Sequence, residues 1–440
     1  MTTGSFLSKW IQDYRQSILV KRMIAVLGID VLVKASGIIL LPLYLRLMSQ
    51  AEFGMYSYIL SIVVTLSVVL NFGLYIPLSK LYHDCQNEAA RGRLLFTVFL
   101  MLTIALSVLM VPIYLFRIDF LFIKILFKNP IDYERYRLAI LLSVLATVFS
   151  FMLTNFFYTS EKINHLKKYN FTRIIGINLI AIGVLYVYRN DDHVHLRLVA
   201  TYVVELVLAA LFYYFCIREM RPQFNLNLIS PSFKLGFPVM ISAILGIVIN
   251  FSDKFFLEKY GTLHELSVYY LAISFSGILA TIYTSFQNAW LPLFFKEKDV
   301  QRNFDKTKRL SLRLLGAFTV LGFLILILMA ILLATKIIQV KYQSTLFVLP
   351  ILLVTQIISA LVPVYSNYLI YFEKTYYTLL IGAGVCFVSL SLSFLLIPSL
   401  GMYGAALVSL VSNLCYLCAY FVISRSFKRN HLQLSTGINK

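Results

Sequence analysis

The chain has 440 residues, of which 60% are hydrophobic and only 13% charged, and its mean hydropathy is +0.81. A soluble domain carries about 25% charged residues, and one of this size could not hide so much apolar surface from water. The composition therefore excludes a soluble fold. The net charge of +19 would suggest nucleic-acid binding in a soluble protein, but the basic residues here lie in short loops between apolar runs, as they do in membrane proteins.

Apolar runs of about 20 residues follow one another along the chain, and each can form a helix that crosses the bilayer. A β-barrel would instead show segments of about ten residues with alternating polarity. The fifth run is short for a span, and residues 120–127 form a further apolar patch that fits either an interfacial helix or an extension of the third span. The runs predict twelve spans, near residues 23–47, 54–77, 94–116, 138–158, 174–188, 198–217, 236–257, 268–290, 310–334, 345–369, 379–398 and 402–424.

Lys and Arg residues are distributed unequally between the two sides of the predicted membrane. Over the loops and tails, about 26 lie on the side of both termini and about 11 on the opposite side. Basic loops tend to stay in the cytoplasm, so both termini are predicted to be cytoplasmic. The basic loop at 117–137 is a local exception. Residues 1–22 predict an amphipathic helix in the membrane interface, because apolar side chains recur at helical spacing among basic ones. Residues 425–440 are predicted to form a cytoplasmic tail.

Two stretches of the sequence correspond at an offset of 213 residues, close to half the chain. Glu52–Tyr56 matches Glu265–Tyr269, and the serine that follows each stretch matches as well. Six spans separate the copies, so both halves enter the membrane in the same direction. This pattern predicts two six-helix lobes, 23–220 and 221–424, related by an axis along the membrane normal, with a central cavity between them. The alternative is a chance match between short apolar sequences.

Three further motifs stand near the ends of predicted spans: Leu40–Leu47, Asn71–Leu74 and Pro398–Ala406. Together with Glu52–Tyr56 they resemble polysaccharide (O-antigen) repeat-unit flippases. These Wzx-like proteins belong to the superfamily of MATE-like multidrug, oligosaccharidyl-lipid and polysaccharide exporters. The resemblance covers most of the chain in length and span order. Peptidoglycan lipid flippases of the same superfamily usually have two spans more than the twelve predicted here.

The resemblance implies an all-α polytopic fold with two six-helix bundles around a V-shaped cavity. It also implies a transporter that moves undecaprenyl-pyrophosphate-linked oligosaccharide from the cytoplasmic to the periplasmic leaflet of the bacterial inner membrane. The expected partners are this lipid-linked oligosaccharide, membrane lipids, a polysaccharide polymerase and a chain-length regulator.

Several ionisable residues lie within the predicted spans. Each costs of order 2.5–3.5 kcal/mol on insertion scales and therefore marks a candidate functional position. Lys34 lies about 16 Å into the first span, and Asp30 precedes it by one turn, so the two can pair. Asp253 and Lys254 lie in the outer part of the seventh span. Glu205 lies roughly 10 Å inside the sixth span.

A cation in the cavity would offset the lost hydration of a pyrophosphate that crosses an apolar layer. We expect Lys34 to be the main anion contact, held by Asp30 or exchanging a proton with it. Asp253 and Lys254 are expected to face the cavity too, because the first and seventh spans correspond in the repeat. Asp30, Glu205 and Asp253 are candidates for ion coupling. The structural alternatives are a fixed Asp30–Lys34 pair and a Lys254 side chain that extends to the membrane surface.

Three further cations, Arg46, Lys80 and Arg173, lie near the ends of predicted spans. They are candidates for passing the charged head group along, although basic residues at span ends also set membrane topology.

The sequence lacks the usual patterns of catalysis. No connection is much longer than about 20 residues, and no phosphate-binding Gly-rich loop or metal-ligand cluster occurs. His193 and His195 fit a solvated loop better than a metal site. The chain is therefore expected to be a transporter without cofactor or metal, rather than an enzyme.

Two other functions remain open at this stage. A MATE-like, cation-coupled drug exporter would favour an acidic cavity, which Lys34 and Lys254 oppose. A membrane O-antigen polymerase would usually carry a large periplasmic loop, and no such loop is found in the sequence.

Overall fold

The computed structural model describes most of the chain, namely residues 36–128, 131–188, 190–372, 374 and 376–435. Every regular element within these residues is a helix, which confirms the predicted all-α class. The first described helix, Ser36–Leu47, is the later part of the first predicted span. The predicted interfacial helix at 1–22 and the candidates Asp30 and Lys34 lie outside the described residues.

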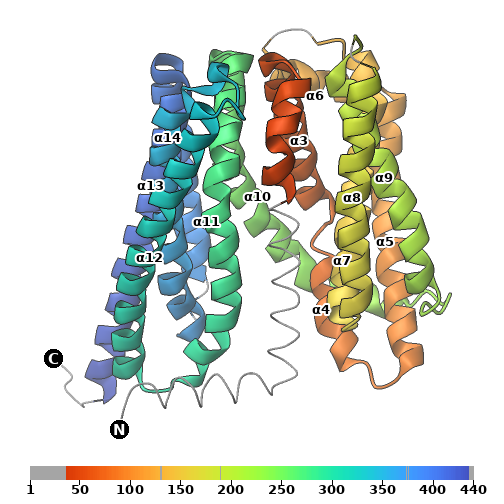
Figure 1. Ribbon diagram of the computed structural model, residues 1–440. Helices are drawn as coiled ribbons and strands as arrows, with labels where there is room; N and C mark the ends of the chain where they lie inside the picture. The colour runs from red at the N-terminus through yellow and green to blue at the C-terminus, as the bar shows by residue number, and fades with distance from the viewer. Residues whose placement is uncertain (1–35, 129–130, 189, 373, 375, 436–440) are drawn as a thin grey trace.

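Two bundles of helices stand side by side (Figure 1). In the N-terminal bundle, Ser36–Leu47 is followed by α3 (Gln50–Leu70), α4 (Tyr75–Asp84), α5 (Glu88–Leu115), α6 (Asp119–Leu126), α7 (Tyr133–Thr159), α8 (Ile163–Val187) and α9 (His193–Ile217). The C-terminal bundle consists of α10 (Ile229–Tyr260), α11 (Leu263–Lys296), α12 (Val300–Ala334), α13 (Thr345–Tyr371) and α14 (Tyr376–Ser435). The helix α10 runs diagonally, packing against α3 and α4 of the first bundle and against α14 of the second.

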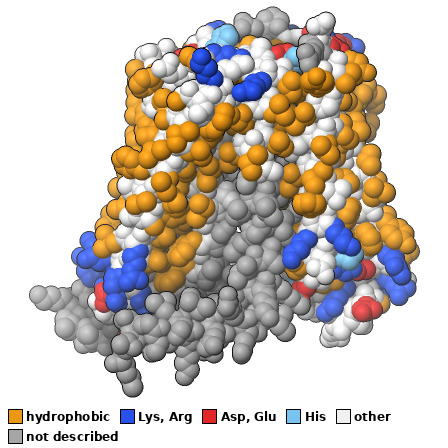
Figure 2. All heavy atoms as spheres, viewed as in Figure 1, with side chains coloured by type: hydrophobic (Ala, Val, Ile, Leu, Met, Phe, Trp, Pro, Cys, Tyr) orange, Lys and Arg blue, Asp and Glu red, His pale blue; other side chains and the backbone are white. Residues whose placement is uncertain are grey.

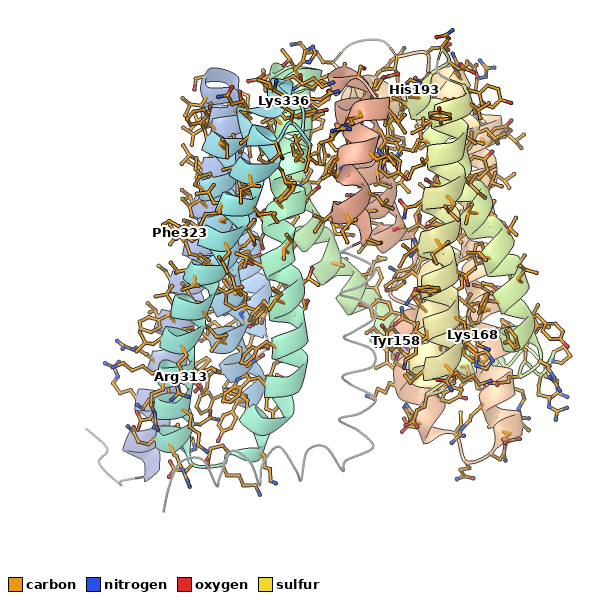
Figure 3. All side chains as sticks on the ribbon, viewed as in Figure 1. Tyr158, Lys168, His193, Arg313, Phe323 and Lys336 are labelled. Atoms are coloured by element: carbon orange, nitrogen blue, oxygen red, sulfur yellow. The ribbon has the colours of Figure 1, made fainter. Side chains whose placement is uncertain are left out.

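Nine of the described helices are long and apolar enough to cross a membrane. This number counts α14 once, although two of the predicted spans fall within it, and it leaves out α10 and Ser36–Leu47. With these taken into account, the described helices are consistent with the twelve predicted spans. Large apolar side chains face outward from them; Phe323 of α12, for example, is 64% exposed (Figure 3). Figure 2 shows such side chains over the middle of the visible face, with Lys and Arg gathered near its two ends. This surface suits contact with lipid.

The helix α14 is two spans joined by a sharp reversal. Its 60 residues would measure about 90 Å if straight, roughly three times the thickness of the hydrocarbon layer. Gly401 interrupts it with φ 54° and ψ −131°, a conformation that glycine adopts without strain. The chain then folds back so closely that a Cβ at Gly404 would lie 2.6 Å from the carbonyl oxygen of Leu396. The reversal falls between the predicted spans 379–398 and 402–424.

The second predicted span, 54–77, is interrupted in the structure. A turn joins α3 to α4, and within it Phe72 and Gly73 have φ values of 52° and 67°. The side chain of Asn71 stabilises the turn by accepting the Gly73 N–H at 2.8 Å. Gly73 lies directly against Gly236 of α10, whose Cβ, if present, would be 3.0 Å from the Gly73 carbonyl oxygen. The break lets the backbones of α4 and α10 approach each other, a long-range cause that the sequence pattern does not show.

Two other elements differ in extent from the prediction. The fifth span is not short, because α8 has 25 residues and begins well before the predicted 174–188. The apolar patch at 120–127 forms the separate eight-residue helix α6 after α5, rather than an extension of the third span.

The helices α3 and α11 begin with the same local structure. Ser49 accepts the backbone N–H of Glu52, whose carboxylate accepts the N–H of Ser49. Thr262 and Glu265 form the same reciprocal pair at the start of α11. Such a capping box satisfies backbone donors that a helix start leaves free. It gives a physical reason for the glutamates that recur at the offset of 213 residues.

Gly54 lies beside the axis that relates the two halves. It packs against the backbone of α11 at Leu263 and Ser267, and Ser267 is the residue that corresponds to Gly54 in the second copy. A residue that touches its own counterpart lies next to a two-fold axis. This contact fits a parallel repeat with its axis at the crossing of α3 and α11.

The two ends of the molecule differ in how the bundles meet. At one end, which contains α6 and is called the α6 end below, α3 crosses α11 and the bundles touch. At the opposite end, where α14 ends and which we call the C-terminal end, the bundles stand further apart (Figure 1). Apart from the diagonal helix α10, the bundles are therefore in contact at one end and diverge toward the other.

Candidate functional site

Asp253 is held inside the C-terminal bundle by three helices. It lies on α10, about 10 Å before the end of that helix, and is only 3% exposed. Its Oδ2 accepts the hydroxyl of Tyr269 at 2.5 Å and that of Ser409 at 3.1 Å. Because Tyr269 lies on α11 and Ser409 on α14, the carboxylate ties α10 to both neighbours. Two hydroxyl groups and the adjacent ammonium group thus surround the carboxylate.

Lys254 supplies that ammonium group. Its Nζ donates to Asp253 Oδ1 at 3.1 Å and to the carbonyl oxygen of Asn250 at 2.5 Å. The side chain is 15% exposed, so it does not extend into solvent at the membrane surface. The predicted pair is present, and in the part of the chain that the structure describes Lys254 keeps one ammonium donor beyond these two bonds.

The N-terminal bundle contains a second ion pair, formed by Arg173 and Glu205. Arg173 Nε donates to Glu205 Oε1 at 3.0 Å, and Nη2 donates to the same oxygen. The Glu205 side chain is 4% exposed and that of Arg173 is 30% exposed. Arg173 lies about 15 Å from the start of α8, and Glu205 about 18 Å from the start of α9, so the pair sits near mid-membrane. Arg173 is therefore not at a span end, contrary to expectation.

Arg46 and Lys80 lie at opposite ends of the molecule. Arg46 is at the α6 end, where its Nη2 donates to the carbonyl oxygen of Lys336 in the C-terminal bundle at 3.2 Å. Lys80 is exposed on α4, toward the C-terminal end. The described candidates thus form two separate pairs and two separate cations rather than a single site.

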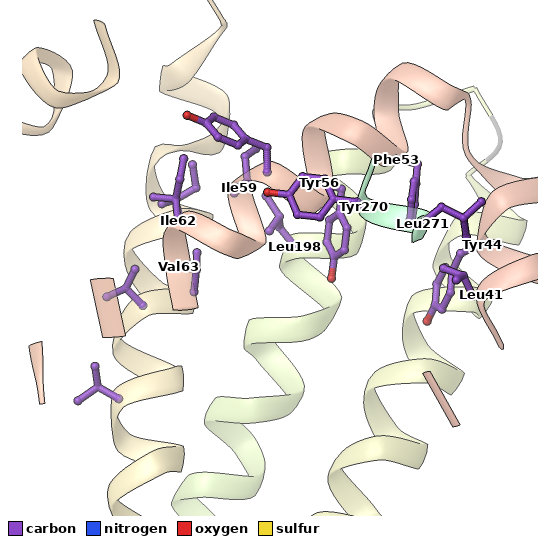
Figure 4. Packing of buried hydrophobic residues seen from close by; sticks show 14 of the residues in the cluster. Leu41, Tyr44, Phe53, Tyr56, Ile59, Ile62, Val63, Leu198, Tyr270 and Leu271 are labelled. Atoms are coloured by element: carbon purple, nitrogen blue, oxygen red, sulfur yellow. The ribbon is translucent and has the colours of Figure 1, made fainter. Parts of the chain in front are cut away.

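The contact between the bundles at the α6 end, which we call the interbundle seam, is polar as well as apolar. Ser61 of α3 and Tyr270 of α11 share a hydrogen bond of 2.6 Å between their hydroxyl groups. The backbone N–H of Lys128 donates to both carboxylate oxygens of Glu258 on α10, at 3.0 and 2.9 Å. Around them one hydrophobic cluster contains side chains of both bundles, including Phe53, Tyr270 and their neighbours in Figure 4. The seam therefore closes the α6 end.

One functional candidate was missed in the sequence. The guanidinium group of Arg197 lies between two aromatic rings, 3.6 Å from the ring centre of Tyr44 and 3.9 Å from that of Tyr56. Tyr44 is itself positioned by a hydrogen bond of 2.9 Å to Asn178. In the part of the chain that the structure describes, no carboxylate lies within ion-pair distance of Arg197. Arg197 on α9 is far in sequence from the two tyrosines, so no local pattern reveals the stack.

Within the described residues, each bundle thus contains a neutralised ion pair at depth, Arg173–Glu205 in one and Asp253–Lys254 in the other. A cation with a carboxylate partner adds no net charge, so an anionic substrate must compete with Asp253 or Glu205 for the paired cation.

The comparison with known families assigns the chain. A family model described as polysaccharide biosynthesis protein matches residues 19–298, more than half of the length. The chain belongs to the polysaccharide biosynthesis protein family. No curated protein matches it.

Solved structures show the same fold at low sequence identity. The lipid II flippase MurJ in an inward closed conformation is 15% identical, with a TM-score of 0.71 over 93% of this chain and 88% of that one. An inward-facing multidrug resistance MATE family transporter of the MOP superfamily is 12% identical, with a TM-score of 0.67 over 92% and 94%. An outward-facing one is 13% identical, with a TM-score of 0.57 over 93% and 94%. The resemblance to this superfamily predicted from the sequence is confirmed, and the chain has the MATE-like transporter fold.

Proposed function

We propose that this protein is a flippase for undecaprenyl-pyrophosphate-linked oligosaccharide repeat units, such as those of the O-antigen of lipopolysaccharide. It moves them from the cytoplasmic to the periplasmic leaflet of the bacterial inner membrane by alternating access. The observation that carries the proposal is the match to the polysaccharide biosynthesis family on a transporter fold. A polysaccharide polymerase and a chain-length regulator are its proposed partners.

The arrangement of the bundles supports a state that is open toward the cytoplasm. Loop charges favour placing the C-terminal end in the cytoplasm, which puts the interbundle seam at the periplasmic side. The higher TM-score with the inward-facing MATE structure than with the outward-facing one fits this assignment. Breaking the seam and closing the opposite end would expose the substrate to the periplasm.

The proposed roles of the charged residues follow from their partners. We propose that Lys34 and Lys254 contact the pyrophosphate, and that Asp30 and Asp253 hold these cations in the empty state. The free donor of the Lys254 ammonium group supports its part in this role. Glu205, paired with Arg173, is the proposed site of ion coupling in the N-terminal bundle.

The test is flipping of a fluorescent polyprenyl-pyrophosphate oligosaccharide by purified protein in liposomes, with surface polysaccharide of a complemented deletion strain as second readout. Lys254→Gln should lower the flipping rate, and Lys34→Glu should abolish it. Lys259→Gln, a change of equal charge near the end of α10, is the control and should flip normally. Normal flipping and polysaccharide with Lys34→Glu would contradict the role of Lys34. Absence of flipping by the unmodified protein would contradict the proposed function itself.

The likeness to multidrug resistance MATE transporters supports drug export as the second candidate. Loss of the gene would then sensitise cells to cationic dyes and leave surface polysaccharide intact. An O-antigen polymerase is disfavoured by the transporter fold, and chain extension by the purified protein would revive it.

A further inference from the structure

Two adjoining cavities open on the side of the N-terminal bundle that faces away from the C-terminal bundle. The first, of about 420 Å³, lies toward the C-terminal end and is lined by four cations: Arg91, Lys162, Arg218 and Arg221. The second, of about 440 Å³, lies along α5 and α9 and is lined almost entirely by apolar side chains. Met220 lines both cavities, so a single molecule can occupy them together.

The basic cavity has more positive than negative charge. Lys162 forms an ion pair with Glu219, which leaves three arginines facing one further lining carboxylate, that of Glu88. Within the described residues these arginines form no ion pair. The Nε of Arg91 is shielded from solvent and has no hydrogen-bond acceptor among them. Buried donors normally have a partner, so a bound anion would supply the acceptor that the Nε of Arg91 lacks.

The apolar cavity extends from the basic one into the membrane-spanning part of the bundle. Leu95 lines the basic cavity and Phe96 the apolar one, which continues along α5 to Thr103, about 10 Å further. On α9, Val207 and Leu211 beside it are 53% and 61% exposed, as expected of a lipid-facing surface. In Figure 1, α5 and α9 lie on the far side of the N-terminal bundle. A basic region at the membrane surface followed by an apolar groove has the polarity profile of a phospholipid.

We propose that these two cavities bind one acidic glycerophospholipid of the surrounding leaflet. Its phosphate lies against Arg91, Arg218 and Arg221, and an acyl chain lies in the apolar groove. Basic pockets at the ends of membrane helices hold anionic lipid head groups by this charge complementarity. The site is remote from the interbundle seam, so its lipid is a resident one and not the transported substrate.

The bound lipid also acts on the connection between the bundles. Residues 218–228 join α9 to α10, and the backbone N–H of Arg221 donates to the carbonyl oxygen of Gly92 on α5 at 3.0 Å. A Cβ on Gly92 would lie 2.5 Å from the backbone carbonyl oxygen of Glu219, so this contact requires glycine. A head group on Arg218 and Arg221 would fix the start of the linker and thereby favour one arrangement of the bundles.

The test is native mass spectrometry of the full-length protein in detergent with added phosphatidylglycerol, phosphatidylcholine or inorganic phosphate. The unmodified protein should retain phosphatidylglycerol in preference to phosphatidylcholine. The triple variant Arg91→Gln, Arg218→Gln and Arg221→Gln should lose more than about tenfold in phosphatidylglycerol affinity, since each cation near an anionic head group contributes roughly fivefold. The control is Lys168→Gln, Arg313→Gln and Lys374→Gln, which removes equal charge from exposed positions toward the same end and should bind normally.

A second variant tests the apolar half without altering charge. Ala210 lines the groove and is exposed, so Ala210→Trp should fill the groove without disturbing the core and should also weaken phosphatidylglycerol retention. Unchanged retention by either variant would overturn the proposal. Retention of inorganic phosphate by the unmodified protein equal to that of phosphatidylglycerol would overturn it too, because the ligand would then be a free anion and not a lipid.

Discussion

Replacing Gly54 by alanine should open the interbundle seam. A Cβ at this position would lie well inside 3.0 Å of the Leu263 carbonyl oxygen, and 3.2 Å from the backbone nitrogen of Ser267. Ordinary contacts begin at 3.4 Å, so α3 and α11 must separate by roughly an ångström. Both obstructing atoms belong to the backbone of α11, and backbone atoms cannot rotate away as the end of a side chain can.

The expected size of the effect follows from overpacking. Forcing an extra methyl group into a packed contact typically costs about 1–3 kcal/mol, which changes the ratio of open to closed seam by roughly 5- to 150-fold. The penalty falls on the closed seam alone, because α3 and α11 do not touch when it opens.

The assay is maleimide labelling of Ser61→Cys in protein whose native cysteines have been replaced. Ser61 bonds to Tyr270 across the closed seam and lies about 17 Å along α3, so reagent reaches it when the seam opens. Gly54→Ala should raise the labelling rate at least about fivefold. Gly316→Ala, on α12 with open space around its Cβ, is the control. Equal labelling rates in Gly54→Ala and the control would refute the reasoning.

The remaining predictions concern thermal stability of the purified protein in detergent. Arg173→Gln leaves the buried Glu205 carboxylate unpaired and should lower the free energy of unfolding by about 3–5 kcal/mol. Adding Glu205→Gln should recover most of this loss. A double variant no more stable than the single one would contradict the pairing. Gly401→Ala should cost about 1–2 kcal/mol of stability because of its positive φ. The control Gly384→Ala, with free space around its Cβ, should be neutral or slightly stabilising. An equal loss in both variants would speak against the chain reversal at Gly401. Arg197→Lys should cost about 1–2 kcal/mol of stability because lysine cannot stack between two rings. Tyr56→Phe keeps the ring and should leave the stability unchanged. A comparable loss with Tyr56→Phe would assign the contribution to the Tyr56 hydroxyl and not to the stacking.

The general architecture could be predicted because lipid imposes a simple rule on the sequence. Each crossing of the membrane needs a long apolar run. Both runs of α14 were found in the sequence, on either side of the chain reversal at Gly401. The extent of α8 was missed because its first turns are polar, from Asn164 to Arg173. The deep charge in this part of α8 is Arg173, which Glu205 on α9 neutralises. Hydropathy is calculated along a single segment, so it does not take a partner on another helix into account.

The charged residues were found individually, but of the two deep pairs that the structure describes only one was predicted as a pair. Asp253 and Lys254 are neighbours in sequence, so their pairing could be proposed. Arg173 and Glu205 are 32 residues apart on adjacent helices, and their contact depends on how each helix is rotated about its own axis. In a membrane bundle the lipid-facing side and the packed side of a helix are both apolar. The periodicity of apolar residues therefore says little about how the helix is rotated. The stack on Arg197 was missed for the same reason.

The contact of Gly54 with Ser267 bears on how such a chain can be assembled. Contact between equivalent positions about a two-fold axis is the geometry of an isologous homodimer. The protein thus contains, within one polypeptide, the interface that two half-length subunits would form. Residues 218–228 act as a tether that keeps the halves at high effective concentration. A residue near the axis must fit against the other half of the same chain, as Gly54 does against Ser267. Residues far from the axis are free of that requirement, and the unlike ion pairs of the two bundles lie in that region.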